Sequence, residues 1–249
     1  MRKSKGVKGP ENSSRCQSSG KLCGYQRFVK LQRVSRTGKL KWVSGCQAMV
    51  VCLLAAGLFF GCAKQEIKNV GTAKGKEIIC FGDSLTFGYG AAPAEDYPTA
   101  LKKYVRMPVI NSGVDGDTTI HALRRFQADV LDKDPYLVIV EFCGNDFIQK
   151  VPQEATIRNL RQIIRKSQEK GAIVALVDIS AGFFLRDYRL AYRKLAREEG
   201  AIFVPAILNG ILTNPSMKSD FLHPNASGYT VIAGRIYNAI KPYLKENKE

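Results

Sequence analysis

The stretch Ile78-Ile79-Cys80-Phe81-Gly82-Asp83-Ser84-Leu85 joins a continuous apolar run to a polar turn. Further apolar runs follow at residues 108–110, 136–142, 172–177 and 201–204. Runs that are apolar on both faces are typical of strands in a parallel sheet that is covered by helices on each side. The segments between the runs carry apolar residues at helical spacing, as in residues 157–164. The pattern predicts a three-layer α/β/α sandwich with a five-stranded parallel sheet.

Residues that could take part in a reaction follow several of these runs. Ser84 follows the first run, Gly116 the second and Asn145 the third, while Asp220 and His223 lie between the fifth run and the last helical segment. In open parallel sheets, ligands bind where the carboxyl ends of the strands meet. The sequence therefore predicts that these five residues gather at one edge of the sheet.

Asp220 and His223 form an Asp-x-x-His pattern, which supplies a carboxylate and an imidazole in one turn. A serine hydroxyl becomes a strong nucleophile when an imidazole takes its proton, and a carboxylate orients that imidazole. The chain has only one other histidine, His121, which is predicted to lie on the surface of a helix. Together with Ser84, the pattern indicates a serine hydrolase. The alternative is that Ser84 only caps a helix and that Asp83 only shapes the turn.

Four blocks of sequence strengthen this interpretation. They are Gly82-Asp83-Ser84-Leu85, Asn111-Ser112-Gly113-Val114-Asp115-Gly116-Asp117-Thr118, Gly144-Asn145-Asp146 and Asp220-Phe221-Leu222-His223-Pro224-Asn225. On these blocks, about residues 77–244 resemble the SGNH, or GDSL-type, esterases and lipases. Within that family the chain is most similar to compact bacterial hydrolases described as multifunctional thioesterase, lysophospholipase and arylesterase, because the second block ends in Gly-Asp-Thr. The resemblance implies the flavodoxin-like sandwich of that family.

The resemblance also implies a role for each residue at the predicted edge. Ser84 would be the nucleophile, His223 the general base and then the acid, and Asp220 the orienting carboxylate. The oxyanion hole would consist of the backbone amides of Ser84 and Gly116 and the side-chain amide of Asn145. These residues would make the protein a serine esterase that cleaves carboxylic or thioester acyl bonds through an acyl-enzyme intermediate.

Two glycines compete for the second oxyanion position. Gly116 is preferred to Gly113 because it occupies the glycine of the Gly-Asp-Thr sequence. Both glycines have a purely structural alternative as turn residues. Asn145 and Asp146 have a similar alternative, because such residues also close the turn between a strand and a helix.

The substrate is predicted from the loops around the site. Phe147 follows Asn145, and Phe183 and Phe184 follow the fourth apolar run, so these aromatic residues are candidates to line an acyl group. Short-chain esters, aryl esters and lysophospholipids are the first expectation. The alternatives are a carbohydrate O-deacetylase and, from a different class, a noncatalytic envelope-binding lipoprotein.

No cofactor is expected. The chain has no CxxC pair or His/Cys cluster of the kind that binds zinc, and Gly88-Tyr89-Gly90 fits neither a dinucleotide nor a phosphate-loop pattern. Cys80 and Cys143 are predicted to be buried free thiols, although a disulfide is open to them if their strands are adjacent.

The positive charge of the chain is concentrated at its start. Residues 1–41 contain twelve of the 38 basic residues and one of the 22 acidic residues. The formal net charge of +16 therefore describes mainly this leader, and no nucleic-acid partner is expected for the folded part.

A secretory signal is predicted before the first strand. Residues 42–63 carry no charge, residues 49–61 are almost wholly apolar, and Cys62 occupies the position of a lipidated cysteine in bacterial lipoproteins. The expected division is a basic leader and lipoprotein-type signal at 1–62, a tether at 63–76 and the hydrolase domain at 77–249. An envelope-anchored lipoprotein is predicted, with an uncleaved membrane anchor and free secretion as alternatives. Because the basic region before the apolar core is long, translation is expected to start downstream of Met1, near Val34 or Leu40.

Overall fold

The structure, a computed structural model, describes residues 65–181 and 185–245 of the 249-residue chain. Five parallel strands form a sheet in the order β2-β1-β3-β4-β5, which confirms the predicted five-stranded parallel sheet. The strands are β1 (Glu77–Gly82), β2 (Val109–Gly113), β3 (Pro135–Glu141), β4 (Ile173–Val177) and β5 (Ile202–Val204).

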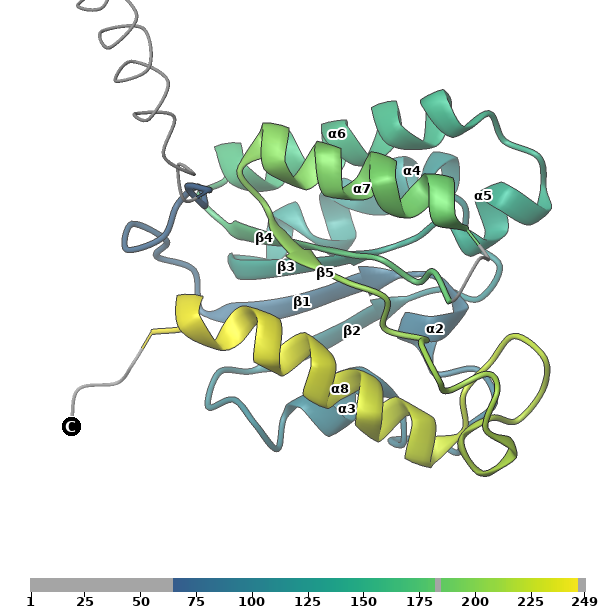
Figure 1. Ribbon diagram of the computed structural model, residues 1–249. Coiled ribbons are helices and arrows are strands. Elements are labelled where there is room, and N and C mark those ends of the chain that lie inside the picture. The colour runs from purple at the N-terminus through teal and green to yellow at the C-terminus, as the bar shows by residue number, and fades with distance from the viewer. Residues whose placement is uncertain (1–64, 182–184, 246–249) are drawn as a thin grey trace, which may run out of the picture. The chain divides into compact units, whose positions relative to one another are not determined.

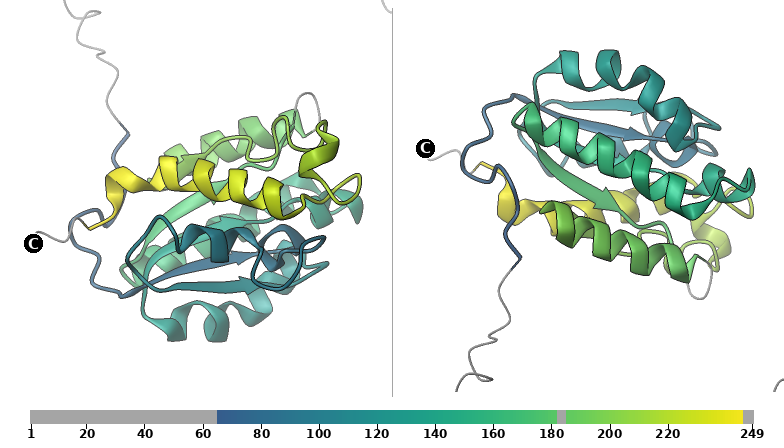
Figure 2. Two further views of the ribbon diagram at one scale, coloured as in Figure 1. Left: turned by 90° about the horizontal axis from the view of Figure 1, so that it is seen from below. Right: turned by 90° about the horizontal axis from the view of Figure 1, so that it is seen from above.

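Helices cover both faces of the sheet (Figure 1). They are α2 (Ser84–Phe87), α3 (Tyr97–Leu101), α4 (Thr119–Asp129), α5 (Gly144–Ile148), α6 (Gln153–Glu169), α7 (Arg186–Glu199) and α8 (Ala226–Ile240), with short 3-10 turns at Leu131–Lys133, Pro215–Met217 and Lys241–Tyr243. The helices α3 and α8 lie on one face, and α4, α6 and α7 lie on the other (Figures 1 and 2). The three-layer prediction is confirmed.

The central strands are buried from end to end, as their apolar runs predict. Every residue of β3 is buried, and so is every residue of β1 after Glu77. Phe81 packs edge-on against Phe142, with 5.2 Å between the ring centroids. Burial of a side chain of this size stabilises the fold by roughly 1.5–3 kcal/mol. Because helices cover both faces, neither face of these strands tolerates polar residues except where a strand ends.

The strand order reverses at β1, since β2 pairs on one side of it and β3 on the other. Chain segments that leave β1 and β3 diverge to opposite faces at such a point and leave a crevice at the carboxyl edge, where the strands end. Ser84 follows the end of β1 by two residues, and Asn145 follows the end of β3 by four. The topology therefore places both at the switch point.

The segment before β1 lies against the domain. The side-chain amide of Gln65 donates to the carbonyl oxygens of Ala196 (3.1 Å) and Ala201 (2.9 Å). The amide of Asn69 donates to the carbonyl oxygens of Gln168 (2.9 Å) and Ala172 (2.8 Å). These hydrogen bonds hold residues 65–76, the larger part of the predicted tether, against the domain near the ends of α6 and α7.

Several predictions concern residues outside the described ranges, namely the leader and signal, Cys62, Phe183 and Phe184. Across the described ranges, no helix combines the length and the apolar character needed to span a bilayer. Cys80 and Cys143 are buried free thiols, which confirms the prediction from the sequence. Burial raises the pKa of each.

Candidate active site

Ser84 lies at the first position of α2, immediately after the turn that ends β1. The side chain of Asp83 caps this helix by accepting a hydrogen bond from the backbone N–H of Leu85 at 3.1 Å. Gly88 ends it with a left-handed φ of 97°. Backbone N–H groups at a helix start have no partner within the helix. The four-residue helix therefore presents both the hydroxyl and the N–H of Ser84 at the carboxyl edge.

A chain of hydrogen bonds connects Ser84, His223 and Asp220. His223 Nε2 lies 3.2 Å from Ser84 Oγ, and His223 Nδ1 lies 2.8 Å from Asp220 Oδ2. With the proton on Nδ1, the imidazole donates to the carboxylate, and Nε2 accepts from the serine hydroxyl. The three residues that the sequence predicts to act together, 139 positions apart at their extremes, are therefore in hydrogen-bonding contact.

The Asp-x-x-His spacing explains the local geometry. Asp220 Oδ1 accepts hydrogen bonds from the backbone N–H groups of Leu222 and His223, each at 2.7 Å. Burial pushes the pKa of Asp220 upward, but the hydrogen bonds from the His223 ring and from these N–H groups outweigh it and lower the pKa overall. The carboxylate consequently stays ionised where the imidazole must be oriented.

Two tyrosines that sequence reasoning did not identify support His223. The ring of Tyr89 lies 4.5 Å from the His223 ring, centroid to centroid, at an angle of 46°. The hydroxyl of Tyr229, on α8, donates to the carbonyl oxygen of Tyr89 at 2.7 Å. The loop after α2 is thereby fixed beside the imidazole. The only signal in the sequence was the Gly-Tyr-Gly pattern around Tyr89. It limits the conformation of the loop but does not predict that Tyr89 lies beside His223.

The two candidate glycines of the second block differ in their surroundings. Gly113 ends β2, its N–H donates to Asn111 Oδ1 at 2.9 Å, and a Cβ there would collide with the backbone of Thr86 and Phe87. Gly116 has a φ of 77° and open space around the position of a Cβ. Among the described residues, the N–H of Gly116 donates to no protein group. Gly113 is therefore used for close packing, whereas the N–H of Gly116 is available to a ligand.

Asn145 is the second residue of α5 and is half-buried. Its side-chain amide makes no hydrogen bond with any residue that the structure describes, so both amide hydrogens are available. The residue before this helix, Cys143, has a φ of 128°, which is a strained conformation for a side chain with a Cβ. Strain of this kind is concentrated at functional sites and persists only where the surroundings enforce it.

Asp146 fixes the position of Asn145, a role that sequence reasoning missed. Its carboxylate is fully buried and accepts hydrogen bonds from the N–H and hydroxyl of Thr119 and from the hydroxyl of Thr156. These partners begin α4 and α6, respectively, so one side chain joins three helices. The Asn-Asp pair in the sequence predicted a turn, but the partners of the aspartate come from distant segments.

Arg125 joins the first two blocks from α4. Its guanidinium donates to Asp117, to the carbonyl oxygen of Ser112 (2.9 Å) and to that of Gly82 (3.0 Å), and it lies 4.4 Å from the centre of the Phe81 ring. It therefore holds the ends of β1 and β2 at a fixed separation. No motif pointed to it, because an arginine on a helix is usually solvated.

A pair of buried carboxyl groups lies beneath the nucleophile turn. Asp83 and Glu141, at the ends of β1 and β3, are both almost fully buried, and Glu141 Oε2 accepts from the hydroxyl of Thr86 at 2.8 Å. Burial raises the pKa of Glu141 to about 7. Burial, followed by the charge of Glu141, raises the pKa of Asp83 as well. The pair therefore retains a proton up to near-neutral pH.

The remaining predicted residues lie around this centre. His121 is exposed on α4, 3.8 Å from Asp117, and forms no hydrogen bond with Ser84. Phe147 is 46% exposed and contacts Tyr188 edge-on at 6.3 Å, beside a hollow of about 360 Å³. Within residues 65–181 and 185–245, no cluster of three His, Cys, Asp or Glu side chains is arranged to hold a metal ion.

This α/β/α sandwich, with a serine, a histidine and a carboxylate linked at its carboxyl edge, has the fold and site of a serine hydrolase. The model of the GDSL-like Lipase/Acylhydrolase family matches residues 80–231. The chain therefore belongs to this family of carboxylic ester hydrolases, as its four sequence blocks predicted.

Individual relatives agree with this assignment. The chain is 28% identical over 178 residues to the Thioesterase 1/protease 1/lysophospholipase L1 of Escherichia coli, covering 68% of this chain and 86% of that protein. It is 28% identical over 206 residues to an arylesterase of Vibrio mimicus, covering 78% of this chain and 100% of that protein. The structure of the psychrotrophic esterase EstA from Pseudoalteromonas is similar with a TM-score of 0.62 and 25% identity, covering 69% of this chain and 100% of that one.

Proposed function

We propose that Ser84 attacks the carbonyl carbon of an ester or thioester while His223 Nε2 takes the hydroxyl proton. The resulting tetrahedral intermediate expels the alcohol or thiol, which receives that proton from His223, and leaves an acyl group on Ser84. Water then attacks the acyl-enzyme and gives a proton to His223, which passes it to Ser84 Oγ as the acid leaves. Asp220 keeps the proton on Nδ1 and stabilises the imidazolium. The observation that carries this proposal is the continuous hydrogen-bonded chain from Asp220 to Ser84.

The oxyanion of the intermediate is proposed to bind the N–H groups of Ser84 and Gly116 and the side-chain amide of Asn145. All three are donors without a protein acceptor among the described residues. A donor held in place before the reaction stabilises the developing charge without reorganisation, and loss of one typically raises the barrier by about 3–4 kcal/mol.

The proposed substrates carry an apolar acyl or aryl group. Several large apolar side chains are exposed in the segments that follow the strands at the carboxyl edge: Phe87, Tyr89, Val114, Phe147, Ile148, Phe221 and Leu222. Phe221 is 88% exposed although it lies between Asp220 and His223. Apolar groups gathered in this way at a catalytic edge favour an apolar ligand. Short-chain esters, aryl esters, thioesters and lysophospholipids all fit, and the names of the relatives support the same range.

Purified residues 63–249 test this function with p-nitrophenyl esters of graded acyl length. The unsubstituted protein should hydrolyse them, Ser84→Ala should lose activity by several orders of magnitude, and His223→Ala should behave like Ser84→Ala. His121→Ala is the matched control and should keep full activity, because its ring lies on the surface of α4. Equal activity in Ser84→Ala and the unsubstituted protein would remove the nucleophile assignment.

The same series distinguishes the alternatives. An envelope glycan deacetylase would release acetate from acetylated sugars and would lose rate steeply as the acyl chain lengthens. A noncatalytic binding protein would show no turnover that depends on Ser84. Rates that hold or rise with acyl length, and that fall in Phe147→Ser, are expected for an apolar acyl site.

We also propose that the hydrolase is anchored in the cell envelope through a lipid on Cys62. The basic leader, the apolar stretch of residues 49–61 and the small residues beside Cys62 support this location. In fractionated bacteria that produce the full chain, esterase activity should sediment with membranes, and Cys62→Ser should move it to the soluble fraction. Retention of Cys62→Ser in membranes would indicate an uncleaved apolar anchor instead, and soluble wild-type protein would indicate secretion.

A further inference from the structure

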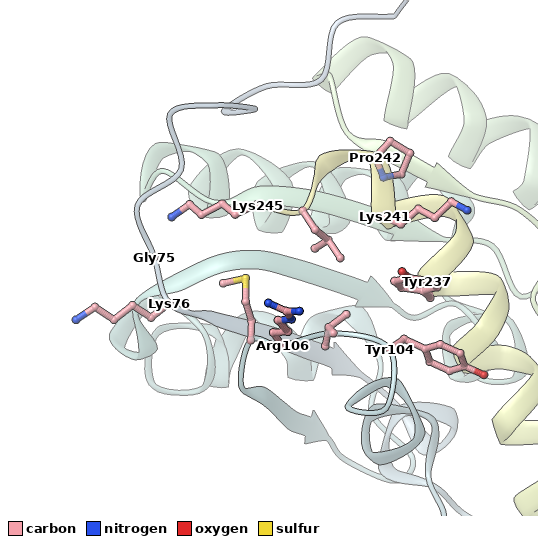
Figure 3. Close-up of a pocket in the computed structure, with 11 residues that line it drawn as sticks. Gly75, Lys76, Tyr104, Arg106, Tyr237, Lys241, Pro242 and Lys245 are labelled. Carbon is pink, nitrogen blue, oxygen red and sulfur yellow. The ribbon is translucent and has the colours of Figure 1, made fainter. Parts of the chain in front are cut away.

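A hollow of about 1000 Å³ lies at the amino edge of the sheet, the edge where the strands begin (Figure 3). Its lining comes from the segment before β1, the segment before β2 and the end of α8 with the 3-10 turn that follows. Because all five strands are parallel, this hollow lies at the opposite end of the sheet from Ser84. The proposed ester chemistry uses none of its residues. We call it the basic hollow and define it by its lining: Gly75, Lys76, Tyr104, Val105, Arg106, Met107, Tyr237, Lys241, Pro242, Leu244 and Lys245.

The rim of the basic hollow is cationic. Lys76, Lys241 and Lys245 are exposed, and Arg106 lines the same space (Figure 3). The lining contains no aspartate or glutamate. Lysine side chains have flexible stems that reach along a surface and keep the charge in water. The rim therefore attracts anions without forming the convergent set of fixed donors that a small free anion needs.

The remaining lining is apolar and aromatic. Tyr104 and Tyr237 stack with ring centroids 5.1 Å apart and an interplanar angle of 21°, and Figure 3 shows them together on one side of the hollow. Val105, Met107 and Leu244 contribute aliphatic surface. Tyrosine rings with a wet hydroxyl and an apolar body are favoured at the boundary between a bilayer and water. An apolar surface surrounded by lysines suits a molecule with an anionic head and carbon atoms behind it.

We propose that the basic hollow binds the head group of an anionic phospholipid and sets the amino edge of the domain against the membrane. The lysines would contact the phosphate, and the tyrosines and aliphatic groups would contact the glycerol and the upper acyl carbons. Chain position supports this occupant, because the apolar stretch of residues 49–61 precedes Gln65 in the sequence, and Gln65 bonds to the carbonyl oxygen of Ala201, directly before β5 at the same edge. In this orientation the catalytic edge faces away from the membrane, since the seven-residue strand β3 alone spans roughly 23 Å.

Vesicle sedimentation with purified residues 63–249 tests the proposal. This segment should fold on its own, because it contains every residue of the hydrophobic core that the structure describes. It should bind phosphatidylcholine vesicles that contain phosphatidylglycerol, bind pure phosphatidylcholine weakly, and dissociate as salt is added. The double substitution Lys241→Glu/Lys245→Glu should weaken binding at least about tenfold. Lys150→Glu/Arg158→Glu, with the same charge change outside the hollow, should bind like the unsubstituted protein.

Three results would overturn the proposal. The first is equal binding to neutral and anionic vesicles. The second is unchanged binding in Lys241→Glu/Lys245→Glu together with lost binding in Phe221→Ser, which would place the membrane at the catalytic edge. The third is saturable binding of inorganic phosphate that displaces vesicles at constant ionic strength, which would make a free anion the ligand. Both double variants should hydrolyse a soluble aryl ester at the unsubstituted rate, which shows that they are folded. A loss of vesicle binding is then distinguishable from a failure of the proposed ester function.

Discussion

Asn145 and Asp146 are neighbours in sequence with different uses in the structure. Asn145 keeps its amide free at the carboxyl edge, while Asp146 is fully buried and accepts hydrogen bonds from three donors. A free donor stabilises a transition state, whereas a saturated buried acceptor stabilises the fold. Substitutions at these two positions should therefore separate catalysis from stability.

Asn145→Ala should lower kcat by about 10²–10³ with little change in the free energy of unfolding, because its amide has no partner to lose. Asp146→Asn should destabilise the protein by about 1–3 kcal/mol, because an amide NH₂ would face donors in a buried site. Urea denaturation and steady-state kinetics on both variants check this. The idea fails if Asn145→Ala unfolds more easily than Asp146→Asn.

The activity should rise between pH 5 and pH 8, because the mechanism needs a neutral imidazole at His223. Asp220, whose pKa is lowered, stays ionised throughout this range and does not shape the profile. Because burial raises the pKa of Glu141 to about 7, the same rise in activity must also be present in Glu141→Gln. A flat profile in both proteins would argue against a histidine base.

Glu141 should make the fold less stable as pH rises. Its pKa is raised from 4.5 to about 7 by burial, so the folded state keeps a proton that the unfolded chain releases. The stabilising contribution is present below pH 4.5 and is lost as pH rises to 7, amounting to about 3 kcal/mol over that interval. Urea unfolding at pH 5 and pH 7 should show this loss in the wild type and a smaller one in Glu141→Gln. Equal losses of stability in the two proteins would show that Glu141 is not the cause.

At the scale of elements, the loop after β2 is shaped by two glycines with different constraints. Gly113 leaves room for the backbone of α2, whereas Gly116 adopts a left-handed φ in open space. A motif shows that glycine is present at both positions but not which constraint applies. The distinction requires the packing of β2 against α2, which are separated in sequence by more than twenty residues.

Gly113→Ala should destabilise the protein strongly, by more than about 2 kcal/mol, since the new methyl group overlaps backbone atoms that cannot move aside. Gly116→Ala should cost about 1 kcal/mol through its positive φ and leave the fold intact. Thermal unfolding of the two variants provides the comparison. A larger loss in Gly116→Ala would show that the loop is packed more tightly than the structure indicates.

At the scale of the whole domain, the segment before β1 is held against the folded part by long-range hydrogen bonds. Its polar and glycine-containing sequence is typical of a flexible tether, and nothing local predicts that Gln65 and Asn69 bond to carbonyl groups more than ninety residues away. Those carbonyl oxygens can accept these bonds because helices and the sheet end at this edge. The segment therefore covers carbonyl groups that water would otherwise bind.

A protein that begins at Lys74 should be less stable than one that begins at Gln65, because it loses the hydrogen bonds of Gln65 and Asn69. With roughly 1 kcal/mol for each bond, a loss of several degrees in Tm is expected. Esterase activity at low temperature should be unchanged, since the site lies at the other edge. Identical Tm values would mean that the segment acts only as a tether.

The parallel sheet, the sandwich and the identity of Ser84, His223 and Asp220 could all be predicted from the sequence. Apolar runs and short motifs are local patterns, and the rule that strand ends meet at one edge converts them into a site. Other properties depend on contacts between distant segments: the ties made by Asp146 and Arg125, the raised pKa values of the buried Asp83 and Glu141, the hydrogen-bonded segment before β1 and the basic hollow. Those properties arise from burial and from hydrogen-bond partners, which no stretch of sequence contains on its own.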